Sequence, residues 1–409
     1  MRRFRSVPAL WHKLSNSKRV RWPMAILAVF LVVTCINTAL ETPPDPLSSS
    51  GNVIPVIIDC TGTAQDGYAL VLAGSVRGLD VRGVTTVYGD LPAGAASQNT
   101  LSLVDYIGLG CPVATGATSP LRRARISSTT ASGAVGLCNV ALPVPHTKPD
   151  ERPAWQLIYD EAVAQNGRLQ LICLGPLTNV ATALQQYPDL AQKLAGITLL
   201  AGELEAGTAD ANALYDPHAL DAVLHSGVPL LIVPFSAAAS DTILLNPCPV
   251  ASGQESGTIH LPTAQLSEKE KQEAEKKIQE KAQKTGRSPA EPSGEQLYWS
   301  DLLTPKSDVY DFLAGVQQYA DWQWKIEGDR DTANGFTFAS MVPVLATAGR
   351  GSICSKVNRW VSVSTTGDDI GFVTFSEYRD KSGVKATVVT RTDRTRYLQA
   401  VENMSRAYT

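Results

Sequence analysis

The sequence lacks the cysteine and histidine patterns of a metal-binding or disulfide-stapled domain. Its 409 residues contain seven scattered cysteines, with no Cys-x-x-Cys pair and no cysteine–histidine cluster. Neither a zinc site nor a small disulfide scaffold is therefore predicted. The sequence also lacks an excess of one charge, since 36 Lys and Arg stand against 39 Asp and Glu. This balance predicts no nucleic-acid partner.

Charge is absent altogether from residues 22–40, an apolar stretch close to the roughly 20 residues that span a bilayer. Residues 1–21 before it carry seven Lys and Arg and no acid, and the first acid is Glu41. This pattern predicts a basic segment followed by a transmembrane helix retained as a signal anchor. The chain is then a single-pass membrane protein whose C-terminal domain faces the non-cytosolic side.

Other interpretations of the N-terminus stay open. A cleaved signal peptide is one, although residues 22–40 are longer than its usual apolar run of roughly 7–15 residues. Basic residues around one apolar face in residues 1–21 also suit a mitochondrial transit peptide. The membrane is therefore that of the secretory pathway or the mitochondrial inner membrane, with the domain in the intermembrane space. A lipoprotein cleavage site ending at Cys35 is a further alternative.

A Pro- and Ser-rich linker at 41–52 leads into a domain that we expect to span 53–404. Apolar strands alternate there with helical segments, which predicts an α/β fold with a mostly parallel, open doubly wound sheet flanked by helices. We expect strands at 53–59, 79–89, 111–116, 169–175, 197–202 and 228–234, with helices at 67–76, 95–108 and 177–188. Ligands of such sheets bind at the carboxyl ends of the strands. Asp59, Asp90 and Leu174 lie at such ends.

The segment 248–294 interrupts this pattern with a highly charged insertion. Its residues 267–287 predict a helix that begins with Ser267 as N-cap and Glu270 in a capping box. Few apolar residues lie inside it, so we expect a solvated helix, with a docking site for a protein partner as the alternative. The alternation resumes with a helix at 310–324, strands at 357–365 and 385–392, and a helix at 393–404.

Several blocks of sequence, in the same order, resemble one family: the inosine-uridine-preferring nucleoside hydrolases. "VIIDCTGTAQDGYAL" resembles the family's aspartate-rich first loop, and "VRGVTTVYGD" its second strand. "CPVATGATSPL", "LICLGPLTNVATAL" and "LLAGELEAGTADANALYDPHAL" are similar to three further family segments, and the residues from Asp368 onward to its C-terminal hairpin and helix. The resemblance covers 53–404 apart from the charged insertion.

The resemblance implies an enzyme that cleaves the bond between ribose and base. Family members hold Ca²⁺ with aspartates and a backbone carbonyl, and the ion binds ribose hydroxyls and activates the attacking water. An aspartate serves as general base. Family members often form dimers or tetramers, so a homo-oligomer is possible here.

Carried over residue by residue, the resemblance assigns Asp59 to the family's first aspartate. Thr61 stands where the family has the base, which is also a metal ligand, and Gln65 where it has a ribose-binding aspartate. Asp66 retains the bidentate metal ligand. Leu174 corresponds to the residue whose backbone carbonyl binds the metal.

The downstream blocks differ from the family as well. Asp90 replaces an asparagine, while Asp210 and Asn212 keep the polar pair of the ribose segment. Met341 and Val342 stand where the family has a histidine and a metal-binding aspartate. The resemblance thus leaves a substrate-binding set of Asp59, Gln65, Asp90, Asp210 and Asn212, and a degenerate metal set of Asp66 and Leu174.

One carboxylate plus neutral oxygens is a poor Ca²⁺ site, and loss of a general base removes roughly 10²–10⁴ in rate. We therefore predict a catalytically impaired pseudoenzyme, a structural or accessory subunit at a membrane, with no cofactor. The alternatives are an active but diverged N-ribosyl hydrolase, which would need Ca²⁺ if that activity survives, and a non-catalytic binder of nucleoside or ribose.

Some polar residues also have ordinary structural interpretations. Asp59 is typical of a cap on the following turn. Asp216 and Pro217 suit the start of a helix, with Asp as N-cap and Pro in the first turn. Asn179 is expected to cap or brace its own turn.

Overall fold

The computed structural model describes residues 53–126, 133, 135–205, 207–238, 302–327, 338–349 and 354–409. The predicted basic segment, transmembrane helix and linker at 1–52 lie outside these residues, as does the charged insertion at 248–294 with its 267–287 helix. Within the described part, no helix combines the length and the apolar character needed to cross a membrane.

The described strands form one nine-stranded sheet in the order β3-β2-β1-β4-β5-β6-β9-β7-β8. Six of the neighbouring pairs are parallel, and β7 pairs antiparallel with both β9 and β8. The strands are β1 (Ile54–Cys60), β2 (Leu79–Thr86), β3 (Val113–Thr115), β4 (Leu169–Cys173), β5 (Leu194–Leu200), β6 (Leu230–Val233), β7 (Cys354–Val363), β8 (Val373–Ser376) and β9 (Val384–Thr392). The predicted α/β class with a mostly parallel sheet is confirmed.

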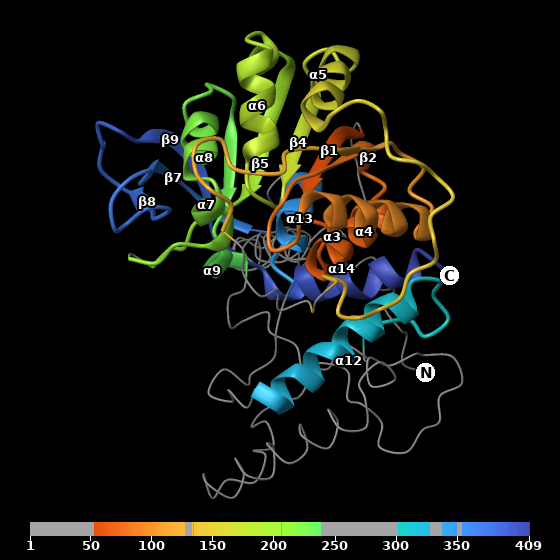
Figure 1. Cartoon of the computed structure of the whole chain (residues 1–409). Helices are drawn as coiled ribbons and strands as arrows, with labels where there is room; N and C mark the ends of the chain where they lie inside the picture. Colours follow the sequence, from red (N-terminus) through yellow and green to blue (C-terminus); the bar gives the residue numbers. More distant parts are fainter. Residues whose placement is uncertain are drawn as a thin grey trace, which may run out of the picture. The chain divides into compact units, whose positions relative to one another are not determined.

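Helices cover both faces of this sheet (Figure 1). They are α3 (Ala64–Ser75), α4 (Ala93–Tyr106), α5 (Ala154–Ala164), α6 (Thr178–Gln186), α7 (Ala211–Tyr215), α8 (Pro217–Leu224), α9 (Phe235–Ala238), α12 (Tyr310–Glu327), α13 (Met341–Ala348) and α14 (Arg394–Arg406), with a short 3₁₀ turn η1 (Leu190–Lys193). Helices α5, α6 and α8 lie on one face, and α3, α4, α13 and α14 on the other.

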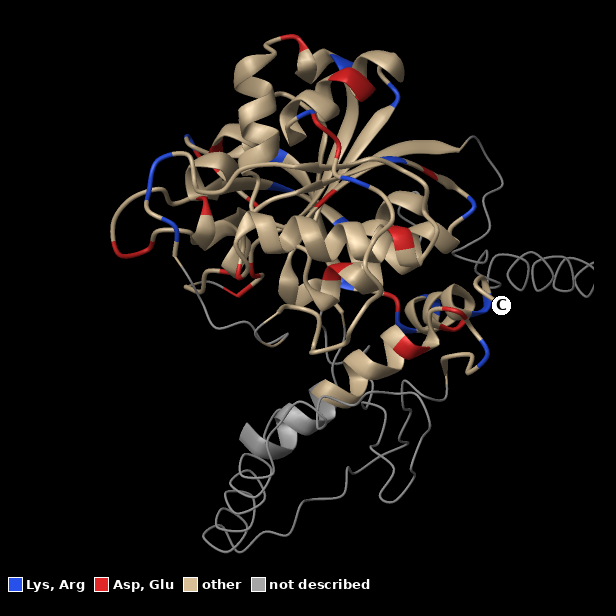
Figure 2. Cartoon of the chain, turned by 45° about the vertical axis from the view of Figure 1, so that its right-hand side comes forward, with Lys and Arg blue, Asp and Glu red and all other residues tan. Residues whose placement is uncertain are grey.

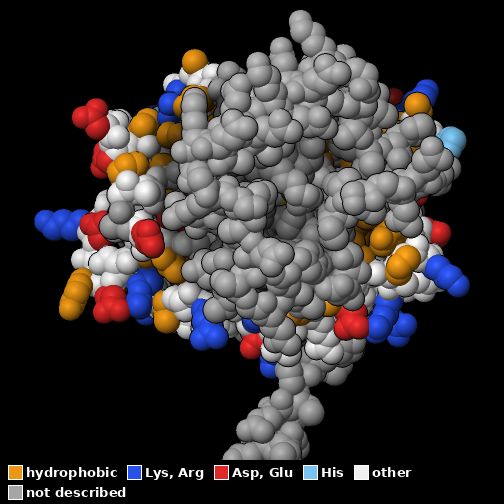
Figure 3. All heavy atoms as spheres, turned by 90° about the horizontal axis from the view of Figure 1, so that it is seen from below, with side chains coloured by type: hydrophobic (Ala, Val, Ile, Leu, Met, Phe, Trp, Pro, Cys, Tyr) orange, Lys and Arg blue, Asp and Glu red, His pale blue; other side chains and the backbone are white. Residues whose placement is uncertain are grey.

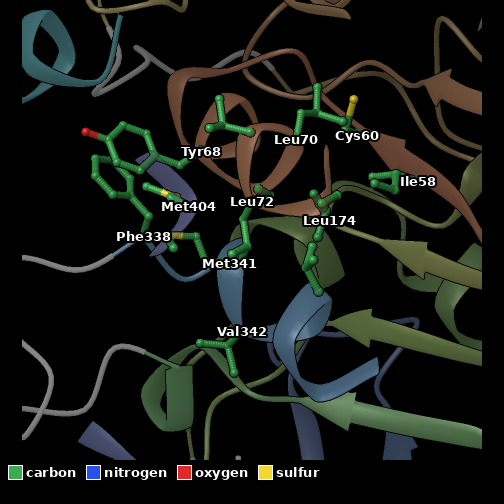
Figure 4. Packing of buried hydrophobic residues seen from close by; sticks show 14 of the residues in the cluster. Ile58, Cys60, Tyr68, Leu70, Leu72, Leu174, Phe338, Met341, Val342 and Met404 are labelled. Carbon is green, nitrogen blue, oxygen red and sulfur yellow. The ribbon is translucent and has the colours of Figure 1, made fainter. Parts of the chain in front are cut away.

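Each face has its own hydrophobic core, because the central strands are buried on both sides. In β1, Ile57 points into the core beneath α5 and α6, whereas Ile58 belongs to the core beneath α3 and α13. Figure 4 shows part of the second core, where the rings of Tyr68 and Phe338 lie side by side. Their centroids are 3.9 Å apart.

The order of the strands creates a switch point beside β1. The chain runs from β1 outward through β2 to β3, and then returns to the other side of β1 to form β4. Helices α3 and α6, which follow β1 and β4, therefore cover opposite faces of the sheet, and the loops that leave these paired strands diverge. In open α/β sheets this is where a ligand-binding crevice forms.

Charged side chains of both signs occur together on the described part of the chain in the views of Figures 2 and 3. Figure 2 shows Lys and Arg interspersed with Asp and Glu around the described domain. Figure 3, a view from below, likewise shows acidic and basic side chains interspersed among the described residues.

Candidate functional site

Backbone hydrogen bonds hold the carboxyl ends of the central strands together at the switch point. The amide of Leu174 donates to the carbonyl of Asp59 at 2.8 Å, and the amide of Val87 donates to the carbonyl of Cys60 at 2.9 Å. The loops that follow β1, β2 and β4 therefore start side by side. The structure thus brings Asp59, Thr61 and Leu174 close together at the switch point.

Thr61 fills the centre of this junction. A Cβ added to Gly175 would lie 2.6 Å from the Thr61 methyl group, and one added to Gly89 would lie 2.8 Å from it. The two glycines, which follow β4 and β2, thus leave room for the threonine side chain. Thr61 is buried, and its methyl group packs where those loops meet.

The Asp66 carboxylate is occupied by hydrogen bonds from within the protein. Its Oδ2 accepts from both the backbone amide and the hydroxyl of Thr61, each at 2.7 Å. Its Oδ1 accepts from the Ser340 hydroxyl at 3.0 Å. Burial raises the pKa of Asp66, and these hydrogen bonds oppose the rise. The bond to Ser340 also places the start of α13 directly beside α3.

Asp59 is buried at the end of β1, with its Oδ1 accepting from the Thr85 hydroxyl at 2.6 Å and from the Asn179 amide at 2.7 Å. Its Oδ2 is buried and has no hydrogen-bond partner among the described residues. Burial raises the pKa of Asp59 to about 7, and the charge of Asp66 adds to the rise. The expectation that Asp59 caps the following turn was wrong, because its carboxylate faces β2 and α6 instead.

Asn179 braces three elements at once. Its Nδ2 donates to Asp59 Oδ1 at 2.7 Å and to the Thr86 carbonyl at 3.0 Å, while its Oδ1 accepts from the Ala117 amide at 2.8 Å. The predicted bracing role is confirmed, and it extends well beyond the turn of Asn179 itself. The side chain ties the ends of β1 and β2 and the loop after β3 to α6.

Asp90 lies on the rim of the same junction. Its carboxylate accepts a hydrogen bond from the Tyr215 hydroxyl, at the end of α7. The Arg125 guanidinium donates to the carbonyls of both Gly89 and Asp90, each at 3.0 Å. The loop after β2 is therefore held from two sides.

Asp210 and Asn212 both bind backbone atoms. Asp210 is the N-cap of α7, accepting from the Ala213 amide at 3.1 Å and from the Gly202 amide at 2.6 Å. Burial raises its pKa to about 6, and the nearby Glu203 adds to the rise. The Asn212 amide donates to the carbonyls of Leu174 and Leu200, each at 2.9 Å. The carbonyl that the resemblance assigns to the metal thus already accepts a hydrogen bond.

The remaining assigned positions lie apart from this network. Gln65 is part-exposed in the first turn of α3, and no hydrogen bond within the described residues joins it to the other assigned side chains. Met341 and Val342 are fully buried in the core beneath α3. Figure 4 shows both on α13, in the same cluster as Leu72 and Leu174.

The side chains at this junction do not fit Ca²⁺. The ion takes 6–8 oxygen ligands, several of them carboxylates. Here Asp66 and the Leu174 carbonyl are engaged by internal donors, and Thr61 and Val342 occupy the other assigned positions. In the described part of the chain, no group of three or more His, Cys, Asp or Glu side chains could hold a metal.

Sequence reasoning missed Thr85 and Ser340, whose hydroxyl groups bind Asp59 and Asp66 in addition to that of Thr61. Thr85 lies on the neighbouring strand, opposite Asp59 in the register of β1 and β2. That register could have suggested the contact, because paired residues point to the same face of a sheet. Ser340 is 274 residues from Asp66, and only the resemblance around Met341 hinted at its position.

Comparison with known proteins agrees with this architecture. The model of the inosine-uridine preferring nucleoside hydrolase family matches residues 56–399. The pyrimidine-specific ribonucleoside hydrolase RihA of Photobacterium profundum is 34% identical over 181 residues, which are 43% of this chain and 58% of that protein. The chain therefore spans about 60% of the length of the curated relatives it matches.

Solved structures show the same fold over a larger share of the chain. A plant nucleoside hydrolase, PpNRh1, matches with a TM-score of 0.65 at 22% identity, covering 86% of this chain and 99% of that protein. A purine-preferring ribonucleoside hydrolase from Gardnerella vaginalis matches with a TM-score of 0.66 at 19% identity, covering 87% and 99%.

Proposed function

We propose that this chain, which belongs to the inosine-uridine preferring nucleoside hydrolase family, does not catalyse calcium-dependent nucleoside hydrolysis and acts as a structural or accessory subunit. The observation that carries the proposal is that donors within the protein already hydrogen-bond the Asp66 carboxylate. This carboxylate accepts three hydrogen bonds, from Thr61 and Ser340, so a cation would have to displace donors that already satisfy it. The hydroxyl of Thr61 offers no general base in place of the family's aspartate.

The proposal includes a membrane tether formed by residues 22–40. Its support is the uncharged stretch behind seven basic residues. Alkaline carbonate extraction of cell membranes tests it. The full chain is expected to stay with the membranes, whereas a Leu27→Arg/Leu31→Arg variant is expected in the soluble fraction. Release of the unaltered chain by carbonate would argue against the tether.

A second candidate is a diverged N-ribosyl hydrolase that works without a metal. Its support is the free Oδ2 atom of Asp59, a buried carboxylate oxygen that no described residue binds. A carboxylate oxygen that no donor occupies can accept a proton from a water that reaches it, and this candidate therefore requires water to enter the junction. The names of the matched proteins, which are ribonucleoside hydrolases, agree with this candidate.

One set of measurements on the full chain separates these functions. Thermal unfolding is followed with and without Ca²⁺, and base release from inosine and uridine is assayed with Ca²⁺ or with EDTA. The matched variant is Thr61→Asp/Val342→Asp, which returns acids to the two assigned metal positions. We expect no Ca²⁺-dependent shift in Tm and no base release for the unaltered chain.

For the double variant we expect Ca²⁺ to raise the stability, by about 2.7 kcal/mol at 100 times the Kd. Base release by the unaltered chain that EDTA abolishes would overturn the proposal. Base release that survives EDTA and is lost in Asp59→Asn would establish the second candidate. Saturable binding of inosine or uridine without base release would instead identify a binding protein.

A further inference from the structure

A groove lies at the amino ends of the central strands, whereas the candidate site lies at their carboxyl ends. It runs along the amino ends of β1, β4, β5 and β6, and extends past the end of α13 to β7 and β9. Its volume is about 580 Å³. This is within the range of roughly 300–1,000 Å³ typical of small-molecule sites.

The walls of the groove are largely apolar. Ile54, Pro55, Leu230, Leu231 and Ala346 line it. The hydroxyls at its inner end are already paired, because that of Thr347 bonds the Thr198 hydroxyl at 2.9 Å and the Pro343 carbonyl at 2.8 Å. The walls therefore favour an apolar ligand over a highly hydroxylated one.

The charged groups of the groove are all of one sign. Arg168 and Lys356 line it, and none of the lining residues is acidic. Among the described residues, Arg168 donates to the neutral carbonyl and side-chain oxygens of Gln165 and pairs with no carboxylate. Lys356, on β7, is half-buried, and burial lowers its pKa with no described carboxylate acting against that effect. Because no carboxylate among the described residues pairs with this partly desolvated ammonium, an anion from outside would supply its counter-charge.

We propose that this groove binds an amphiphilic monoanion, a short apolar chain ending in a carboxylate, with the carboxylate on the Lys356 ammonium and the apolar chain along Leu230 and Leu231. The apolar walls account for the chain, and the unopposed positive charge for the carboxylate. The inference is independent of the function proposed above, because the groove contains none of the residues of the candidate site.

Hexanoate is a suitable probe, because it combines one carboxylate with a short apolar chain. Calorimetric titration of the full chain is expected to give one hexanoate per chain. The Lys356→Met variant, which keeps an unbranched side chain but loses the charge, is expected to bind at least tenfold more weakly. Lys385→Met is the matched control, since Lys385 is exposed on β9 outside the groove, and it is expected to bind as the unaltered chain does.

Two further comparisons keep the test decisive. Hexan-1-ol has the same chain without the charge, and inorganic phosphate has charge without the chain; both are expected to bind at least tenfold more weakly than hexanoate. Reductive methylation of the unaltered chain, read by peptide mass spectrometry, is expected to modify Lys356 more slowly with hexanoate present. Equal affinity of Lys356→Met, equal affinity for hexan-1-ol or phosphate, or undiminished methylation of Lys356 would overturn the proposal.

Discussion

Asp59 shows at the scale of one residue how burial controls a carboxyl group. It is 1% exposed, and its pKa is about 7 where an exposed aspartate has 3.8. Between these two pH values the unfolded chain has released this proton while the folded chain still holds it. The free energy of unfolding therefore falls as pH rises through this window, and levels off above it.

From this shift we predict a pH-dependent loss of stability to which Asp59 contributes about 4 kcal/mol. In Asp59→Asn, which keeps the oxygen that binds Thr85 and Asn179, the stability should fall less between pH 4 and pH 7. Urea unfolding at pH 4, 5.5, 7 and 8 measures the slope for both proteins. An equal slope in the variant would show that Asp59 is already ionised at low pH.

The aspartates of the site could be located from the sequence, but their partners could not. Asp59 and Asp66 follow an apolar strand at a spacing that resembles a known loop. Two of the hydroxyls that bind them belong to Thr85 and Ser340, which lie far away in the sequence and have no local signature. Their roles depend on which strands and helices become neighbours, a property of the whole fold rather than of any segment.

Among the helical elements, α8 shows how one cap can join several parts of the chain. As predicted, Asp216 is its N-cap and Pro217 lies in its first turn. Asp216 accepts from the Ala219 amide at 3.0 Å, and also from the Leu121 amide at 2.9 Å and the Thr178 hydroxyl at 2.8 Å. The cap therefore also fixes the loop after β3 and the start of α6.

We predict that Asp216→Ala lowers the free energy of unfolding by about 3–5 kcal/mol, since it removes a cap and leaves two further donors unpaired. The matched control is Asp393→Ala. Asp393 is exposed, and among the described donors the Arg396 amide is the one it accepts from as the cap of α14, so its loss should cost about 1 kcal/mol. Chemical denaturation of both variants provides the comparison, and equal losses would mean that the additional bonds of Asp216 contribute little.

Strands were easier to predict than helices, for a physical reason. β1, β4 and β5 are buried on both faces and therefore appear in the sequence as continuous apolar runs. Helix α5 was not predicted, although Ala154, Leu157, Ile158 and Ala162 form a buried stripe with helical spacing after Pro153. Trp155 and Tyr159 are part-buried against the same core, and Val163 is exposed, so the apolar residues of α5 are not confined to one stripe, which weakens that pattern.

At the scale of the whole molecule, stability should be graded across the sheet. β1 and β4 are central and paired on both sides, whereas β8 has only β7 as a neighbour among the described strands. We predict that amides of β1 and β4 exchange with solvent only through global unfolding, and that those of β8 exchange more than about tenfold faster. Hydrogen exchange followed by mass spectrometry tests this, and uniform protection across the sheet would contradict it.

The order of the strands has a practical consequence. The chain enters the domain at Ile54, at the amino end of β1, while Thr61 and Asp66 lie beyond its carboxyl end. Anything joined ahead of residue 53 is attached on the side of the sheet away from the switch point. A chip or bead coupled at Val53 itself would thus lie beside the groove that this residue lines, and would leave the switch point facing the flowing sample.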